Sequence, residues 1–414
     1  MKRLFTFILT LTMAFSFCVN SFAAAATTTT ATETTAATTA TTEASADTSN
    51  TQATSASYGT SKLSGAPDIV AESAVVMDAG TGTVLYGKEA STKRYPASIT
   101  KVMTALLAVE NSNMSDIITY SNAAVNGIEA GSSTAGINVG AKLTVEDSLY
   151  ALMLVSANEA AAAIAEHISG STTEFAKLMT KRAKELGCKN TQFKNPHGLP
   201  DEEHYTTAYD MGLILKEAMK HPEFRKIAGT ISYTLKKSDS LTDTLELWNH
   251  AKILRQNSDY YYEYAEGAKT GFTQVALNTL VTYAKKDNVE LICVILKDYG
   301  ADKSYTDTAN LFKWAFNQVK AVTPLTNFSL KTAMTENSSI DSAKLDQIQL
   351  LNSSYDTNFS VLVKKGFDES KLKTAFKLDE DKKTGRLGYI IISCDGKELG
   401  RTEVTYDITS KQGK

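Results

Sequence analysis

The sequence has little cysteine and no excess of charge of either sign. Four cysteines in 414 residues are too few for a disulfide-held scaffold or an array of zinc ribbons. Lys and Arg number 43 against 46 Asp and Glu, a net charge of −3. Nucleic-acid binders usually carry a basic surface, so no nucleic-acid partner is expected. Since 43% of the residues are hydrophobic, the chain can build a substantial core, and a globular protein is expected.

The sequence also lacks the short motifs of two large groups of hydrolases. None of its five histidines pairs with another in the His-Glu-x-x-His pattern of zinc peptidases. The Gly-x-Ser-x-Gly pattern of α/β-hydrolases is absent as well. We therefore expect no metal and no other cofactor, and we interpret His197 and His204 as structural or substrate-loop residues.

A targeting signal is predicted at the beginning of the chain. A basic pair precedes an apolar stretch over residues 4–17. The small residues Ser21 and Ala23 follow at the two positions that a signal peptidase recognises before its cleavage site. The stretch is shorter than the about 20 residues that a membrane-spanning helix needs. Residues 1–23 are therefore predicted to be a secretory signal peptide, and the mature chain is expected outside the cytoplasm. No amphipathic helix is evident near Lys414, so no clear membrane anchor is expected.

Three further regions are predicted from composition and periodicity. Residues 24–66 begin with a stretch made almost entirely of Ala, Ser and Thr, which cannot bury enough apolar surface to fold and is predicted to be a disordered linker. Residues 67–323 show strand patterns at both ends and helical patterns between them, which predicts an α+β domain whose sheet uses both ends. Residues 324–414 show short alternating runs and are predicted to form a small all-β domain. The elements expected are strands at 74–77, 83–86, 279–283, 290–296, 347–351, 359–363, 387–392 and 402–406, and helices at 96–109, 149–168, 174–186, 209–220 and 310–319.

The first candidate catalytic pair is Ser98 and Lys101. They are three residues apart at the start of a predicted helix, so they share one face. The free N–H groups of a helix N-terminus can stabilise an oxyanion. Apolar residues follow Lys101, and a lysine in such surroundings has a lowered pKa and can act as the base for a serine nucleophile. On its own, however, the pattern is more often a helix cap beside a solvent-facing lysine.

Two more short motifs lie downstream. Ser156 and Asn158 fall where an apolar run gives way to an Ala-rich helix, and such a hydroxyl and amide can relay a proton and bind a substrate carbonyl. Lys269, Thr270 and Gly271 lie on a strand-like segment, where a cation and a hydroxyl can hold a carboxylate and a glycine permits close approach of a peptide. On its own, the Ser156 motif would be interpreted as a helix cap, and the bland alternative for the Lys269 motif is an ordinary turn that enters a strand.

Second copies of two motifs occur in the C-terminal region. Ser370 and Lys373 stand in a solvated stretch, and Lys383, Thr384 and Gly385 follow an acidic run that predicts a hydrophilic turn. Neither copy is assigned to the site.

The order Ser-x-x-Lys, Ser-x-Asn, Lys-Thr-Gly is typical of penicillin-binding proteins and serine β-lactamases. The chain resembles the D-alanyl-D-alanine carboxypeptidase family, the low-molecular-mass penicillin-binding proteins, from about residue 67 into the C-terminal region. Residues 95–104, 195–199, 204–210 and 266–273 look like segments of that family. Glu159 stands where the family commonly has Asp, and the C-terminal amphipathic anchor of many members is missing.

The resemblance implies a β-lactamase/transpeptidase-like fold, an antiparallel sheet with helices packed on it. It also implies removal of the terminal D-alanine from peptidoglycan stem peptides that end in D-Ala-D-Ala, in the bacterial cell envelope, with β-lactams as covalent inhibitors. Ser98 would be the nucleophile, Lys101 its base and Ser156 a proton relay. Asn158, Lys269, Thr270 and Gly271 would bind substrate. The backbone N–H groups of Ser98 and Phe272 would form the oxyanion hole.

Other activities of the same fold stay open from the sequence. A class A β-lactamase would need a glutamate between the second and third motifs; residues 193–199 contain no carboxylate, although Glu202 and Glu203 follow. A D,D-transpeptidase or endopeptidase differs only in the acyl acceptor or the bond cleaved. A penicillin-binding sensor that stays acylated would need a signalling module, and none is evident.

Overall fold

The computed structural model describes residues 61–62, 65–337, 340–342, 344–345 and 353–406. The predicted signal peptide, most of the predicted linker and the strand expected at 347–351 lie outside these residues. Within them, no helix is long and apolar enough to cross a membrane.

The first part of the described chain contains the following elements: β1 (Ser61–Lys62), β2 (Ser73–Asp78), β3 (Val84–Lys88), η1 (Ala97–Thr100), α1 (Lys101–Asn111), β4 (Ile117–Thr119), α2 (Asn122–Asn126), β5 (Lys142–Thr144), α3 (Val145–Leu154), α4 (Asn158–Ser169), α5 (Thr172–Glu185), α6 (Ala208–Ala218), α7 (Pro222–Gly229), β6 (Ser232–Leu235), β7 (Leu245–Trp248), η2 (Lys252–Leu254), β8 (Ala265–Thr273), β9 (Leu277–Lys286), β10 (Val289–Asp298) and α8 (Ala301–Gln318). The second part contains β11 (Val319–Val322), α9 (Leu330–Thr335), β12 (Ser353–Tyr355), β13 (Val361–Lys364), η3 (Glu369–Lys371), β14 (Lys373–Asp381), β15 (Arg386–Cys394) and β16 (Lys397–Tyr406).

A six-stranded antiparallel sheet has the order β1-β3-β2-β10-β9-β8. β2, from the start of the folded chain, pairs with β10, which lies more than 200 residues later, with Val75 opposite Val294. The prediction of an α+β fold whose sheet uses both ends of the domain is thereby confirmed. β1, a two-residue strand inside the range predicted as linker, pairs with β3.

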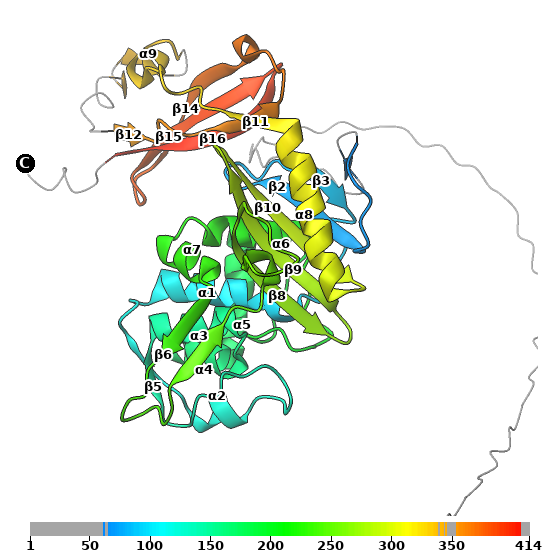
Figure 1. Cartoon of the computed structure of the whole chain (residues 1–414). Coiled ribbons are helices and arrows are strands. Elements are labelled where there is room, and N and C mark those ends of the chain that lie inside the picture. Colours follow the sequence, from blue (N-terminus) through cyan, green and yellow to red (C-terminus); the bar gives the residue numbers. More distant parts are fainter. Residues whose placement is uncertain (1–60, 63–64, 338–339, 343, 346–352, 407–414) are drawn as a thin grey trace, which may run out of the picture. The chain divides into compact units, whose positions relative to one another are not determined.

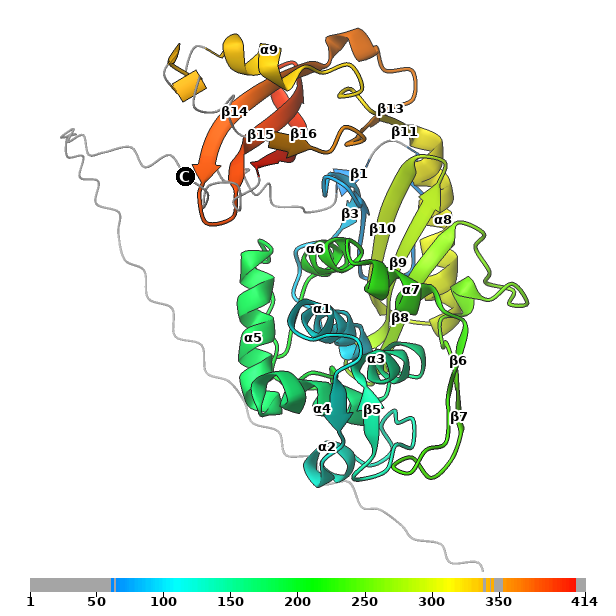
Figure 2. The ribbon, with the colours of Figure 1, turned by 90° about the vertical axis from the view of Figure 1, so that its left-hand side faces the viewer.

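Helices cover both faces of this sheet, as Figures 1 and 2 show. On one face α8 packs on the residues of β10 that include Leu291, Cys293 and Ile295; on the other, α1, α3, α4 and α6 share a core with Ile292 and Val294. Because successive side chains of a strand point to opposite faces, a strand covered on both sides is apolar throughout. All six residues of β2 are accordingly buried.

Side-chain caps fix the beginnings of several helices. Thr144, Ser171 and Thr207 accept hydrogen bonds from backbone N–H groups in the first turns of α3, α5 and α6. Such a bond satisfies one of the N–H groups that a helix leaves unpaired at its start. α4 ends at Gly170, whose φ of +74° closes the helix.

The region predicted as one helix over 149–168 is two helices. α3 ends at Leu154 and α4 begins at Asn158, and Ser156 between them has a φ of +63°. This left-handed conformation cannot continue a right-handed helix. The apolar, Ala-rich pattern runs through the break, which is why periodicity alone did not reveal it.

The C-terminal region has its own sheet, with the antiparallel order β12-β16-β15-β14. It packs around a separate core that includes Leu387, Ile390 and Val404. The expectation of a β-rich C-terminal region is confirmed, with one short helix, α9, beside it. β11, which directly follows α8, pairs with β13.

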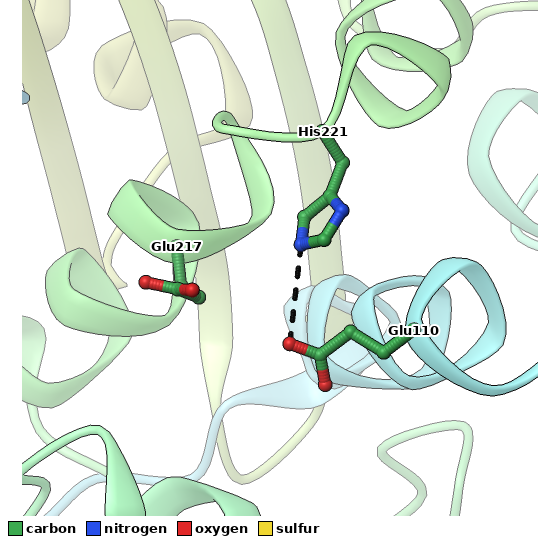
Figure 3. A group of neighbouring side chains, drawn as sticks. All are labelled: Glu110, Glu217 and His221. Carbon is green, nitrogen blue, oxygen red and sulfur yellow. Dashed lines mark ion pairs between the residues drawn. The ribbon is translucent and has the colours of Figure 1, made fainter. Parts of the chain in front are cut away.

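An ion-pair network ties three helices and the start of a fourth together. Glu110 of α1 accepts two hydrogen bonds from the Arg182 guanidinium of α5, at 2.6 Å from Nη2 and 3.0 Å from Nε. Nη2 also lies 3.5 Å from Glu217 of α6, and His221, before α7, lies 3.9 Å from Glu110. Figure 3 shows the His221 imidazole directed at the Glu110 carboxylate, with Glu217 nearby on α6. Since the Arg182 and Glu110 side chains are 23% and 17% exposed, solvent screens this pair only in part.

Replacing Arg182 with methionine is expected to lower the free energy of unfolding by about 1–2 kcal/mol, because two neighbouring carboxylates lose their shared cation. Chemical denaturation measures the change. The control is Lys181→Met on the same helix, whose side chain is 74% exposed; it should change stability by less than about 0.5 kcal/mol. Equal losses in the two variants would show that the network contributes nothing specific.

Candidate active site

The segment that carries Ser98 is held in position by contacts from two distant parts of the chain. It forms the short helix η1, whose first residue, Ala97, has a φ of +51°, an uncommon conformation for a residue with a side chain. The Thr279 hydroxyl of β9 donates a hydrogen bond of 2.9 Å to the carbonyl of Pro96. Gly198 approaches so closely that a Cβ there would lie 1.9 Å from the Ala97 carbonyl oxygen. These contacts place Ser98 at the start of the η1–α1 helical segment.

Lys101, one turn after Ser98, is completely buried. Its Nζ lies 3.1 Å from Ser98 Oγ, 2.7 Å from Asn158 Oδ1 and 2.8 Å from the carbonyl oxygen of His197. Burial, and the nearby charge of Lys269, hold the pKa of the Lys101 amine well below its usual value. A neutral amine donates two hydrogen bonds and accepts one. The amide and carbonyl oxygens can only accept, so the remaining contact of a neutral Lys101 is its lone pair with the Ser98 hydroxyl.

The break between α3 and α4 places the second motif beside this pair. Ser156 is 4% exposed, and its Oγ has no hydrogen-bond partner among the described residues. Asn158 is the first residue of α4; its side chain accepts from Lys101 and its backbone N–H donates to the Ser133 carbonyl at 2.9 Å. The left-handed turn at Ser156 therefore brings one hydroxyl and one amide of the motif to the same site.

The third motif lies on β8, the edge strand of the six-stranded sheet. Lys269 is 1% exposed, burial lowers its pKa to about 7, and its Nζ donates to the carbonyl of Thr270 at 2.9 Å. Gly271 pairs with Thr279, and a Cβ at this position would lie 2.7 Å from the Ser98 nitrogen. Only glycine permits this approach of β8 to the helix that carries Ser98. Phe272 is 56% exposed.

A cleft of about 410 Å³ joins the three motifs. Of the residues predicted for the site, Ser98, Ser156, Asn158, Thr270, Gly271 and Phe272 line it. Lys101 and Lys269 are not among its lining residues; both are buried, and the charge of Lys269 helps to lower the pKa of Lys101. The structure thus brings the predicted residues together from η1, α1, the α3–α4 break and β8.

Several residues of the site were not predicted from the sequence. The His197 carbonyl binds Lys101, Thr279 holds Pro96, and Ser132, Ser133 and His250 line the cleft. A backbone carbonyl leaves no mark on a sequence, because every residue has one. The second motif copies lie in the C-terminal region, on η3 and β14 and in the β14–β15 turn, and none of their residues lines this cleft.

The His197–His204 region packs behind the nucleophile segment. His204 is 1% exposed; its Nδ1 accepts from the Lys194 N–H at 3.2 Å and its Nε2 lies 2.9 Å from Thr100 Oγ1. With Nδ1 acting as an acceptor, the imidazole is neutral and donates from Nε2. Burial lowers the pKa of His204 to about 4. Burial and the charge of Lys101 lower the pKa of His197 to about 3.

Among the described residues, only Glu110, Glu217 and His221 offer three ligand atoms close enough together for a metal ion, all within 4.8 Å. Arg182 already occupies Glu110 with two hydrogen bonds. A cation would have to displace this guanidinium, so the group fits an ion-pair network better than a metal site.

Acid should destabilise the fold through His204. The ordinary pKa of 6.5 applies when the chain is unfolded, whereas the folded value is about 4. As the pH falls below about 6.5, the unfolded state binds the proton first, so stability is lost progressively down to about pH 4, by up to about 3 kcal/mol. In His204→Gln, denaturation between pH 7 and pH 4 should show a flatter loss. The exposed His167→Gln, the control, should follow wild type; a His204→Gln curve parallel to wild type would contradict this assignment.

Comparisons with known proteins agree with this geometry. The family model of the D-alanyl-D-alanine carboxypeptidases, peptidase family S11, matches residues 60–300. A Bacillus subtilis D-alanyl-D-alanine carboxypeptidase is 34% identical over 346 residues, covering 81% of this chain and 84% of the relative. A variant of a Streptomyces DD-transpeptidase superimposes with a TM-score of 0.56 at 32% identity, over 60% of this chain and 99% of that one. Penicillin-binding protein 6B of Escherichia coli shares the fold, with a TM-score of 0.61 at 23% identity, over 81% and 95%. The chain therefore belongs to the D-alanyl-D-alanine carboxypeptidase family.

Proposed function

We propose that this chain removes the terminal D-alanine from peptidoglycan stem peptides ending in D-Ala-D-Ala, through an acyl-serine intermediate. The observation that carries the proposal is the buried Lys101 amine, 3.1 Å from Ser98 Oγ and fixed by two acceptors, Asn158 Oδ1 and the His197 carbonyl. A low pKa makes the neutral amine available near physiological pH, and a neutral amine in contact with a hydroxyl can remove its proton.

Acylation begins when Ser98 Oγ attacks the carbonyl carbon of the penultimate D-alanine. The hydroxyl proton passes to Lys101 as the new carbon–oxygen bond forms. The backbone N–H groups of Ser98 and Phe272 stabilise the negative charge that develops on the carbonyl oxygen. The approach of Gly271 to the Ser98 nitrogen supports this role, because it brings the two backbone segments together at the cleft.

The departing D-alanine must receive a proton on its nitrogen. Ser156 Oγ lines the cleft and has no partner among the described residues, so it is available to relay the proton from Lys101. Water then attacks the acyl ester, with the same groups working in the reverse sense. Each step uses side chains of this chain, backbone N–H groups and water.

Substrate binding is assigned to β8 and to Asn158. An extended peptide can add along the edge strand β8 by backbone hydrogen bonds. Lys269 and Thr270 would hold the terminal carboxylate, and Asn158 would orient both the peptide and Lys101. A β-lactam has a strained amide and a carboxylate in a similar arrangement and would acylate the same serine, forming an ester that hydrolyses slowly.

The cellular setting follows from the substrate. Peptidoglycan lies outside the cytoplasmic membrane, and the predicted signal peptide over residues 1–23 agrees with export to the bacterial envelope. We propose stem peptides as the natural partner and β-lactams as covalent inhibitors, with no nucleic-acid partner.

The rival β-lactamase function is not favoured by the placement of the candidate glutamates. Neither Glu202 nor Glu203 lines the cleft, and Glu203 is 66% exposed and pairs with Lys194 at 2.8 Å. A transpeptidase would use the same acyl-enzyme and transfer it to an amine instead of water. An assay with and without an amine acceptor distinguishes the two.

Ser98→Ala should abolish labelling by fluorescent penicillin and lower D-alanine release from a D-Ala-D-Ala peptide by roughly a thousandfold or more, because the nucleophile is lost. Ser370→Ala, in the second Ser-x-x-Lys copy, is the matched control and should match wild type in both assays.

Equal labelling of wild type and Ser98→Ala would refute the site. Labelling of wild type without any release of D-alanine would favour a penicillin-binding sensor over a peptidase. Release that occurs only when a D-amino acid acceptor is added would favour a transpeptidase.

Activity should fall on the alkaline side through Lys269. With a pKa of about 7 in the free enzyme, Lys269 carries its charge below that pH and loses it above. The kcat/KM for a peptide with a free carboxylate should therefore decline as the pH rises through about 7. Lys269→Arg keeps a charged group at every pH measured, since the pKa of arginine exceeds about 12. Its profile, scaled to its own maximum, should lack this decline; identical profiles would show that another group titrates.

A further inference from the structure

A buried carboxylate stands beside the catalytic motif without a part in the proposed chemistry. Glu159, directly after Asn158 in the first turn of α4, is 1% exposed. A buried charge is unfavourable unless hydrogen bonds compensate it. The partners of Glu159 therefore indicate what it does.

One oxygen of Glu159 receives four hydrogen bonds from a single short segment. Oε1 lies 2.6 Å from the Thr134 hydroxyl, 2.7 Å from the N–H of Ala135, 3.1 Å from that of Gly136 and 3.4 Å from that of Ile137. The other oxygen, Oε2, is buried and has no partner among the described residues. Hydrogen bonds to a charged acceptor are stronger than those between neutral groups.

The segment so held is one wall of the catalytic cleft. Residues 131–137 contain no helix or strand, and Gly131, Ser132 and Ser133 line the cleft. Asn158 holds the same segment through its backbone N–H, 2.9 Å from the Ser133 carbonyl. Neighbouring residues of α4 thus support this wall, Asn158 at its cleft side and Glu159 behind it.

We propose that Glu159 is a positioning residue that fixes residues 131–137 as a wall of the substrate cleft. The kinetic part of this inference rests on the proposed function; the structural part does not. The carboxylate makes no contact with a reacting atom in the proposed mechanism, so its effect is on substrate binding.

Two conservative substitutions separate reach from charge. Glu159→Gln keeps an oxygen at the same distance along the side chain but loses the charge, and its amide nitrogen replaces the unpartnered Oε2. Glu159→Asp keeps the charge but is shorter by one methylene, so its carboxylate cannot reach all four donors. Glu166→Gln, farther along α4, is the control.

Hydrogen exchange at the amides of residues 135–137 is the structural measurement. Glu159→Asp should accelerate exchange at least tenfold relative to wild type, whereas Glu159→Gln and Glu166→Gln should stay within about threefold. In D-alanine release, Glu159→Asp should raise KM several-fold with little change in kcat. Glu159→Gln, which keeps an acceptor oxygen at the same reach, should keep the wild-type KM.

Unchanged exchange and unchanged KM in Glu159→Asp would overturn the positioning role. If wild type releases no D-alanine, the proposed function fails, while the exchange measurement still decides whether Glu159 holds this wall.

Discussion

A lysine amine without access to water is the interaction on which the rest of this site depends. Lys101 reaches the nucleophile only because it is the next turn of the same helical segment, and it stays there because Asn158 and the His197 carbonyl bind its hydrogens. Those two acceptors come from α4 and from the loop after α5. The helix break at Ser156, the close approach of Gly198 and the packing of α1 against α3, α4 and α6 can all be understood as requirements of this one arrangement.

The sequence allowed the fold to be predicted where patterns were local and regular. The two ends of the sheet, α5 and α6 and the β-rich C-terminal region carry clear periodicities or caps, and the structure confirms them. The helix break after Leu154 was missed because alanine and leucine favour helix on both sides of it. The residues on either side of the break bind distant backbone groups: the His250 N–H donates to the Leu154 carbonyl, and the Asn158 N–H donates to the Ser133 carbonyl. No local pattern shows these contacts.

Residue types of the site could be predicted from three short motifs in a fixed order, but their surroundings could not. The burial of Lys269 and the contact of the Thr279 hydroxyl depend on pairing between β8, β9 and the nucleophile segment. The carbonyl of His197 reaches Lys101 from the loop after α5. In the sequence, Glu159 is only a small departure from the Asp that the family commonly has next to the motif. No pattern near it in the sequence indicates a contact with residues 134–137. Only the fold places those N–H groups around its carboxylate.

The two buried lysines have a consequence for the balance between durability and catalysis. An amine withdrawn from water weakens the folded state, because its protonated form is better solvated in the unfolded chain. An apolar side chain of similar length at position 101 would remove this cost of burying an amine, but it would also remove the catalytic base. Variants of this protein with the highest thermal stability are therefore expected to be catalytically inactive. The trade-off between stability and activity is concentrated in a single side chain.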